Sequence, residues 1–209
     1  MASRVCLVHY HEIGLKGHNR SIFEKRLLRN LEALLSAYPL VTIHRIAGRL
    51  CVFLREGTER DVALACADAI VGVPGVARVS CGFKCERDLA QMGEAALLAL
   101  SEAGEFASFK VHARRNHTDF PVDSMQMNRE VGAILCAAHP DKRVIMKSPD
   151  VTVGVEVVQS AAYVYARSVR GIGGLPVGSS GRVACLLSSG IDSPVALWRM
   201  ARRGAVPVG

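Results

Sequence analysis

Hydrophobic and polar positions follow two different periods along the first third of the chain. Four segments alternate with the two-residue period of a half-buried strand: 4–10, 40–47, 49–54 and 77–83. Two segments place apolar side chains three or four positions apart, which predicts helices: 21–35 and 61–71. Ser21, with Glu24 three residues later, fits a capping box at the start of the first helix. The resulting order, strand, helix, strand, strand, helix, strand, predicts a ferredoxin-like fold.

A second set of elements follows with the same mixture of periods. Helical spacing covers 89–103 and a segment from Asp123 or Ser124 to about His139, where Pro140 ends it. Strand-like alternation covers 108–114, 151–158 and 162–169. After a glycine-rich stretch at 171–181, a strand at 183–187, a helix and the start of a strand at 205–209 complete the chain. The fold class expected is therefore mixed, α+β followed by α/β.

The turn between strand 183–187 and the next helix is the most informative motif. It reads Ser188-Ser189-Gly190-Ile191-Asp192-Ser193, and Pro194 is expected at the first helical position. A strand-turn-helix of this kind points backbone N–H groups at one spot, where the helix dipole favours an anion. We therefore expect a pyrophosphate cradle, the alternative being an ordinary turn with a serine cap. It is not a Walker loop, because no Gly-Lys-Ser/Thr follows.

The turn resembles the SGGxDS signature of the PP-loop ATP pyrophosphatases, with Ser189 in place of the usual glycine. With GIGGLPVG at 171–178, the string LLSSGIDSPVA is similar to the tRNA 4-thiouridine synthetases. The same resemblance covers segments 12–20, 109–115 and 148–153, and the second set of elements resembles the THUMP domain, an RNA-binding module.

The resemblance implies a ferredoxin-like N-terminal domain, a THUMP domain and a PP-loop domain in that order. We expect them at 1–60 (with a last helix and strand extending to about 83), 61–170 and 182–209, with a linker at 171–181. Because a parallel sheet needs several βα units to form its crevice, the PP-loop domain is incomplete and the sequence looks truncated.

The resemblance also implies which residues bind the nucleotide, with ATP and Mg²⁺ as cofactors. The implied contacts are Leu186, Leu187, Ser188, Ser189, Gly190, Asp192 and Ser193. Asp192 is the candidate catalytic residue, acting through Mg²⁺ or by holding the turn, with a helix cap as the alternative role. Ser189 is tolerable if its φ is negative and strained if the turn needs a positive φ.

The charge of the chain favours a polyanionic partner. The formal net charge is +7 with a pI near 9.2. Strand alternation places three side chains of the candidate RNA surface on one face, and the other candidates flank them: Lys110, His112 and Arg114, then Arg115, His117, Lys142, Arg143 and Lys147. The alternative is a solvated strand face.

A second candidate RNA contact contains Lys16 and Arg20, beside the basic residues Lys25, Arg26 and Arg29. Here the alternative is a polar loop that leads into a basic helix.

Several classes of protein are disfavoured. The sequence has no run of 18 or more apolar residues, which a membrane-spanning helix would need. The N-terminus lacks the pattern of a secretory signal. The seven cysteines contain no CxxC pair, and Cys81 with Cys85 is only a weak metal or redox signal. The histidines have no metal-ligand spacing, so no metal site is expected in the protein itself. A reducing cytoplasm is the simplest compartment.

The function that the resemblance implies is the tRNA-binding part of a 4-thiouridine synthetase, which adenylates uridine 8 with ATP for sulfur transfer. It also implies a role in thiamine thiazole synthesis. Expected partners are tRNA and a cysteine desulfurase or other sulfur carrier, with a homodimer and no membrane. The alternatives are a stand-alone THUMP-type RNA-binding module with an inert PP-loop, and another PP-loop tRNA thiolase such as a 2-thiouridylase.

Overall fold

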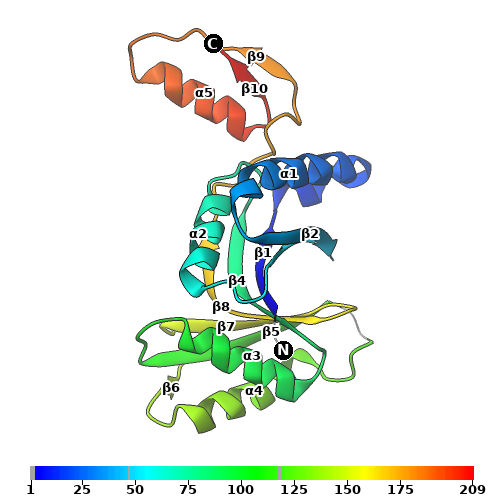
Figure 1. Cartoon of the computed structure of the whole chain (residues 1–209), viewed down its shortest axis with the longest axis vertical. Helices are drawn as coiled ribbons and strands as arrows, with labels where there is room; N and C mark the ends of the chain where they lie inside the picture. Colours follow the sequence, from blue (N-terminus) through cyan, green and yellow to red (C-terminus); the bar gives the residue numbers. More distant parts are fainter. Residues whose placement is uncertain (1–2, 47, 117–118) are drawn as a thin grey trace. The chain divides into compact units, whose positions relative to one another are not determined.

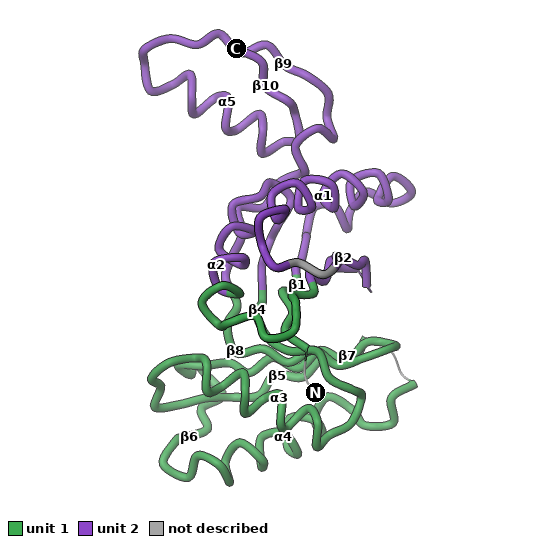
Figure 2. Tube along the Cα trace, viewed as in Figure 1, with its two compact units in different colours: residues 1–7, 53–63, 80–168 green, residues 8–52, 64–79, 169–209 purple. Residues whose placement is uncertain are grey.

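The computed structural model describes residues 3–46, 48–116 and 119–209, which form two compact units. The first unit contains Met1–Leu7, Phe53–Ala63 and Ser80–Ser168, and the second contains Val8–Val52, Leu64–Val79 and Val169–Gly209 (Figure 2). Strands β1, β3, β4 and β8 and helix α2 contribute residues to both units.

The first third of the chain has the element order that its sequence predicts (Figure 1). The strands are β1 (Ser3–His9), β2 (Leu40–Ile46), β3 (Arg49–Leu54) and β4 (Arg78–Cys85). The helices are the 3-10 helix η1 (Glu12–Asn19), α1 (Arg20–Leu34), the 3-10 turn η2 (Leu35–Ala37) and α2 (Arg60–Val71). The strands are ordered β2-β3-β1-β4, so the ferredoxin-like prediction is confirmed.

The first unit contains the second set of elements. These are α3 (Leu89–Ser101), β5 (Ser108–Arg115), α4 (Ser124–Ala138), β6 (Arg143–Val144), β7 (Val151–Val157) and β8 (Ala162–Arg170). The strand order is β4-β8-β7-β5-β6, with β5 parallel to β6 and β7, and β7 antiparallel to β8. Both helices begin at an aspartate cap: Asp88 accepts from the backbone N–H of Gln91, and Asp123 accepts from that of Gln126.

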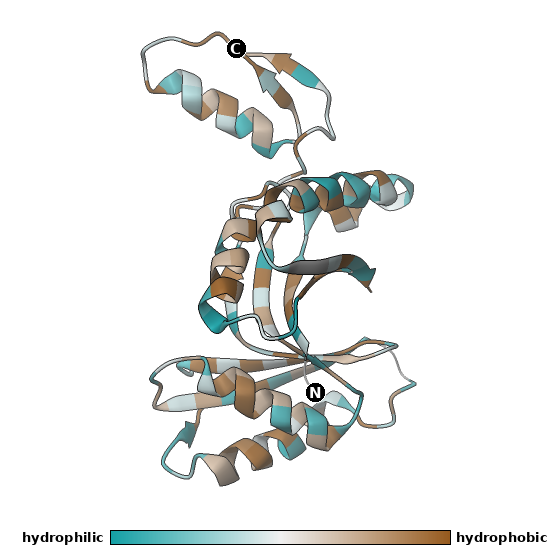
Figure 3. Ribbon diagram, viewed as in Figure 1, coloured by the Kyte–Doolittle hydropathy of each residue, from teal (hydrophilic) through white to brown (hydrophobic). Residues whose placement is uncertain are grey.

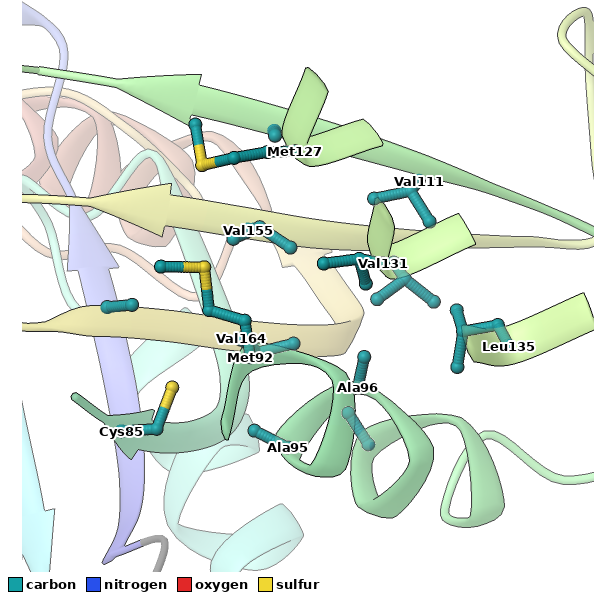
Figure 4. Packing of buried hydrophobic residues seen from close by; sticks show 14 of the residues in the cluster. Cys85, Met92, Ala95, Ala96, Val111, Met127, Val131, Leu135, Val155 and Val164 are labelled. Atoms are coloured by element: carbon teal, nitrogen blue, oxygen red, sulfur yellow. The ribbon is translucent and has the colours of Figure 1, made fainter. Parts of the chain in front are cut away.

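The core of the first unit lies between these two helices and the sheet (Figure 4). Helix α3 supplies Met92 and Ala96, and α4 supplies Val131 and Leu135, all buried. The sheet supplies a matching row: Phe109, Val111, Ala113, Val153, Val155 and Val164. The ribbon coloured by hydropathy shows the apolar stripes of α3 and α4 and their polar opposite faces (Figure 3). The expected alternation of β5 is confirmed, because Lys110, His112 and Arg114 point away from this core.

The last part of the second unit is one strand-turn-helix-strand. It consists of β9 (Arg182–Ala184), α5 (Asp192–Arg202) and β10 (Val206–Val208), with β9 and β10 parallel. The glycine-rich stretch before it is held by backbone hydrogen bonds: Gly173 N–H to the carbonyl of Val76 at 2.8 Å, and Leu175 N–H to that of Arg202 at 2.9 Å.

Three local expectations are wrong. Strand β9 ends at Ala184 rather than 187, because only Arg182 to Ala184 pair with β10. Helix α5 begins at Asp192, so Pro194 is its third residue, still within the turn that needs no N–H donor. The capping box at Ser21 does not form, because α1 already begins at Arg20 and its Asn19 cap makes no side-chain bond.

Candidate nucleotide cradle and nucleic-acid interface

Two serine hydroxyls close the turn before α5. The Oγ atoms of Ser188 and Ser193 lie 2.7 Å apart, and the Ser188 N–H donates to Ser193 Oγ at 3.1 Å. The Gly190 N–H donates to Ser188 Oγ at 3.3 Å. These bonds make a tight, exposed loop at the start of the helix.

The N-terminus of α5 is open to an anion. Its Ile191 cap makes no side-chain bond, so the capping residue does not occupy the N–H groups of Asp192 and Ser193 at the start of the helix. Asp192 is exposed, is not the cap, and forms no hydrogen bond or ion pair with the described residues. The helix-cap role is therefore wrong, and its carboxylate is available to a hard cation such as Mg²⁺.

Ser189 fits its position without strain. The only non-glycine residue with a positive φ in the described part of the chain is Ser148, so the backbone of Ser189 suits a side chain. Leu186 and Leu187 lie between β9 and the turn, with 96% and 60% of their surfaces exposed. Both are thus accessible to a nucleotide beside the cradle.

The β5 face brings together the candidate RNA residues of the first unit. Lys110 donates from Nζ to the carbonyl of Met146 at 3.1 Å, and Arg114 donates from Nε to His112 Nε2 at 3.0 Å. Arg143 lies on β6, which pairs with β5, and Lys147 follows that strand; both side chains are exposed. His112 and Arg114 are exposed as well, so this edge of the sheet presents an open cationic surface, the β5 face.

Arg115 has a different role from Arg114. It donates from Nη1 to the carbonyl of Phe120 at 2.7 Å, which fastens the loop that follows β5. His117, in that loop, lies outside the described residues.

Lys16 and Arg20 lie in the second unit, and both are engaged there. The Lys16 ammonium lies 5.2 Å from the ring centre of Phe23. Arg20 donates to Glu24 at 2.7 Å and to the Tyr10 hydroxyl at 2.8 Å. Glu24 also accepts from Tyr10; burial opposes its charge, but these hydrogen bonds outweigh burial and lower the pKa of the carboxyl. Part of the Arg20 charge is therefore neutralised within the protein.

The segment 148–150 supports the β5 edge rather than a ligand. The Asp150 carboxylate accepts from the N–H groups of Ala107 and Ser108 at 2.9 and 2.8 Å and from the Ser108 hydroxyl at 2.9 Å. Sequence reasoning missed this role, because the groups that Asp150 accepts from lie about forty residues earlier in the chain.

The two close cysteines of the sequence, Cys81 and Cys85, have different surroundings. Cys81 lies nearest to Cys6, with 3.2 Å between the two sulfur atoms, and not to Cys85. Burial, followed by nearby carboxylates, raises the pKa of the Cys85 thiol to about 12. Nowhere in the described part of the chain do three His, Cys, Asp or Glu side chains gather as metal ligands would. None of the described helices has the length and apolar composition of a membrane span.

Comparison with known families matches three successive parts of the chain. Residues 5–80 match the ThiI ferredoxin-like domain, 86–167 the THUMP domain, and 178–208 the family described as thiamine biosynthesis protein (ThiI). A chain with these parts in this order is a THUMP protein of the PP-loop class. It belongs to the ThiI family.

Individual relatives agree. A probable tRNA sulfurtransferase of Geobacillus thermodenitrificans is 38% identical over 199 residues, which are 95% of this chain and 49% of that protein. A solved 4-thiouridine synthetase–RNA complex with bound ATP superposes with a TM-score of 0.83 at 33% identity, over 98% of this chain and 51% of that one. PH1313 from Pyrococcus horikoshii superposes with a TM-score of 0.86 at 30% identity, over 98% and 67%. The chain spans about half the length of the curated relatives it matches.

Proposed function

We propose that this chain is the tRNA-binding and pyrophosphate-binding part of a tRNA 4-thiouridine synthetase. The observation that carries the proposal is the presence, in one chain, of an exposed cationic strand face in the THUMP region and an open serine turn at a helix N-terminus. The solved relative that binds both RNA and ATP supports this pairing of functions.

In the proposed reaction, an oxygen of uridine 8 attacks the α-phosphorus of ATP and pyrophosphate leaves. The outer sulfur of a carrier persulfide would then attack C4 of the activated uridine and displace AMP. A second thiol would break the sulfur–sulfur bond, which leaves the outer sulfur on the uridine and joins the two thiol sulfurs as a disulfide. In this reaction the chain would hold the leaving pyrophosphate with the N–H groups at the start of α5 and with the Ser188 and Ser193 hydroxyls. Asp192 is the residue that would hold Mg²⁺, which would supply charge neutralisation when bound.

The RNA side of the proposal assigns phosphate contacts to the β5 face. The planar guanidinium groups of Arg114 and Arg143 can each contact a phosphate through two nitrogens. Lys110 and Lys147 add single ammonium charges beside them. Arg115 is a weaker candidate, because its guanidinium holds Phe120. Lys16 and Arg20 are proposed as secondary contacts.

Further partners follow from the proposal. A cysteine desulfurase or another sulfur carrier would supply the persulfide, and the same sulfur would serve thiamine thiazole synthesis, which the family description supports. We also propose a homodimer and a cytoplasmic location.

The experiment uses a protein extended to the full length of the relatives. Asp192→Ala is expected to remove most ATP-dependent thiolation, a loss of at least ~2 kcal/mol of transition-state stabilisation, and to leave tRNA affinity within about twofold. Retained thiolation in this variant would show that the turn does not serve the reaction.

A further inference from the structure

Three cations of α1 meet at one small cavity of the second unit. The cavity, of about 200 Å³, is lined by Ile22, Lys25, Arg26, Arg29, Gly178 and Ser179. The α1 residues are spaced three and four apart, so they share one face of the helix. The other wall comes from a segment about 150 residues further along the chain. We call this cavity the α1–Gly178 pocket.

The positive charge of this pocket has no counterion among the described residues. Lys25, Arg26 and Arg29 form no hydrogen bond or ion pair with any described residue, and no acidic side chain lines the cavity. Arg20 and Arg45, by contrast, both pair with Glu24. Like charges three or four positions apart on a helix repel one another, and an anion at the cluster would relieve that repulsion.

The wall opposite α1 is rigid and close. Gly178 has a φ of +87°, and a Cβ on it would stand 3.1 Å from the guanidinium carbon of Arg26, so that guanidinium lies directly against the Gly178 backbone. The N–H groups of Gly178 and Ser180 both donate to the carbonyl of Gly204, at 2.8 and 2.9 Å. Asn30 ties the same segment to α1 by donating to the carbonyl of Val177 at 3.1 Å.

One polar group at the pocket has no partner. The Ser179 hydroxyl oxygen is buried and makes no hydrogen bond to the described residues. A buried hydroxyl without a partner is costly, and native proteins rarely keep one. The hydroxyl faces Gly204, since a Cβ on that glycine would stand 2.4 Å from it, so it lies behind the wall of the pocket.

We propose that the α1–Gly178 pocket binds one backbone phosphate of tRNA, a contact separate from the β5 face. The inference rests on the proposed function, since it presumes that the chain binds tRNA. Two guanidinium forks and one ammonium can donate to the two charged, non-bridging oxygens of a phosphodiester. Because Gly178 and Ser179 lead directly into β9 and the Ser188 turn, a phosphate held here fastens α1 to the segment that carries the nucleotide cradle.

The test measures tRNA affinity at several salt concentrations for Arg26→Ala, Arg29→Ala and Ser179→Ala. Each arginine variant is expected to bind about tenfold more weakly at 0.1 M salt and to lower the slope of log K against log salt by about one. Ser179→Ala, which keeps every charge and removes a hydroxyl that faces Gly204, is expected to leave the affinity and the slope unchanged. Arg26→Lys should recover part of the loss, because it restores the charge without the fork.

Arg182→Ala serves as the control. Arg182 is exposed in the same unit, and its replacement by alanine removes the same charge as Arg26→Ala. Equal effects of Arg182→Ala and Arg26→Ala would overturn the pocket, since only net charge would then matter. If the Arg26 and Arg29 variants bind tRNA with unaltered affinity while Arg114→Ala binds more weakly, the phosphate site in the pocket is overturned. The proposed function then still stands. Absence of tRNA binding by the unaltered chain would instead overturn the proposed function.

The source of the phosphate is tested separately with ATP and inorganic phosphate. We expect tRNA to shift the side-chain Nε resonances of Arg26 and Arg29, and millimolar ATP or phosphate to shift them less. Saturation of these resonances by ATP alone would assign the pocket to a nucleotide and overturn the assignment to RNA.

Discussion

Arg114 donates from Nε to Nε2 of His112, two residues earlier on the exposed side of β5, at 3.0 Å. The bond holds the guanidinium at Nε and leaves its two terminal nitrogens without a hydrogen bond to a described residue. A planar, fixed fork loses little side-chain freedom when it meets a phosphate. The pair is therefore the best-prepared phosphate contact of the β5 face.

Arg114 and Arg115 are expected to fail in different ways when they are replaced by alanine. Arg114→Ala should weaken tRNA binding and lower its salt slope by about one, with little change in Tm. Arg115→Ala should destabilise the protein by about 1–2 kcal/mol, because the carbonyl of Phe120 loses its donor. Binding titrations and thermal unfolding separate the two. The assignment fails if Arg114→Ala lowers Tm as much as Arg115→Ala does.

Two glycines of the first unit are expected to respond oppositely to alanine. Gly154 faces Tyr165 across the β7–β8 ladder, and a Cβ there would stand 2.4 Å from the ring, so Gly154→Ala should cost about 1–3 kcal/mol. A Cβ on Gly132, inside α4, would meet only Val111 Cγ2, at an ordinary contact distance of 4.0 Å, so Gly132→Ala should stabilise by about 0.5–1 kcal/mol. Chemical denaturation measures both. A stabilising Gly154→Ala would mean that the ring of Tyr165 lies elsewhere.

Ser189→Gly tests the departure from the PP-loop signature. Since the backbone of Ser189 does not need a positive φ, restoring glycine is expected to leave ATP affinity within about twofold, or slightly weaker because the loop gains freedom. Isothermal titration of ATP into a protein extended to the relatives' length checks this. Markedly tighter binding by the glycine variant would show that serine strains the bound turn.

The hydroxyl of Tyr10 is expected to ionise only at high pH. Burial, followed by the hydrogen bond to Glu24, raises its pKa from an ordinary value near 10 to about 12. Because the folded pKa is the higher one, its contribution to stability is complete below pH 10 and is lost as the pH rises through about 12. Ultraviolet difference titration should show a late phenolate that Tyr10→Phe removes. An early phenolate that disappears in Tyr10→Phe would contradict the buried Tyr10–Glu24 bond.

Periodicity predicted most of the fold because each element has one apolar face. The alternation of β5 placed Phe109 and Val111 inside and Lys110 outside, as the structure has them, and Asp123 caps α4 as expected. The capping box at Ser21 failed because the side chain of Glu24 is bound to Tyr10 and Arg20, a contact that helix rules do not consider.

The sequence predicted the site that lies within one segment and missed the contacts that join separate segments. The Ser188 turn is local, so its spacing is visible in the sequence. The roles of Arg115 and Asp150 depend on backbone atoms of other segments, and the α1–Gly178 pocket joins residues far apart in the chain. No pattern of side chains within one segment indicates such contacts.

The most direct test of the account is the salt dependence of tRNA binding by the 209-residue chain. The account predicts binding whose log K falls steeply with log salt, by about 0.9 per phosphate contact, and a slope reduced by about two in the Lys110→Ala/Arg114→Ala double variant. The account is contradicted if tRNA affinity does not depend on salt, or if the double variant binds as the unaltered chain does.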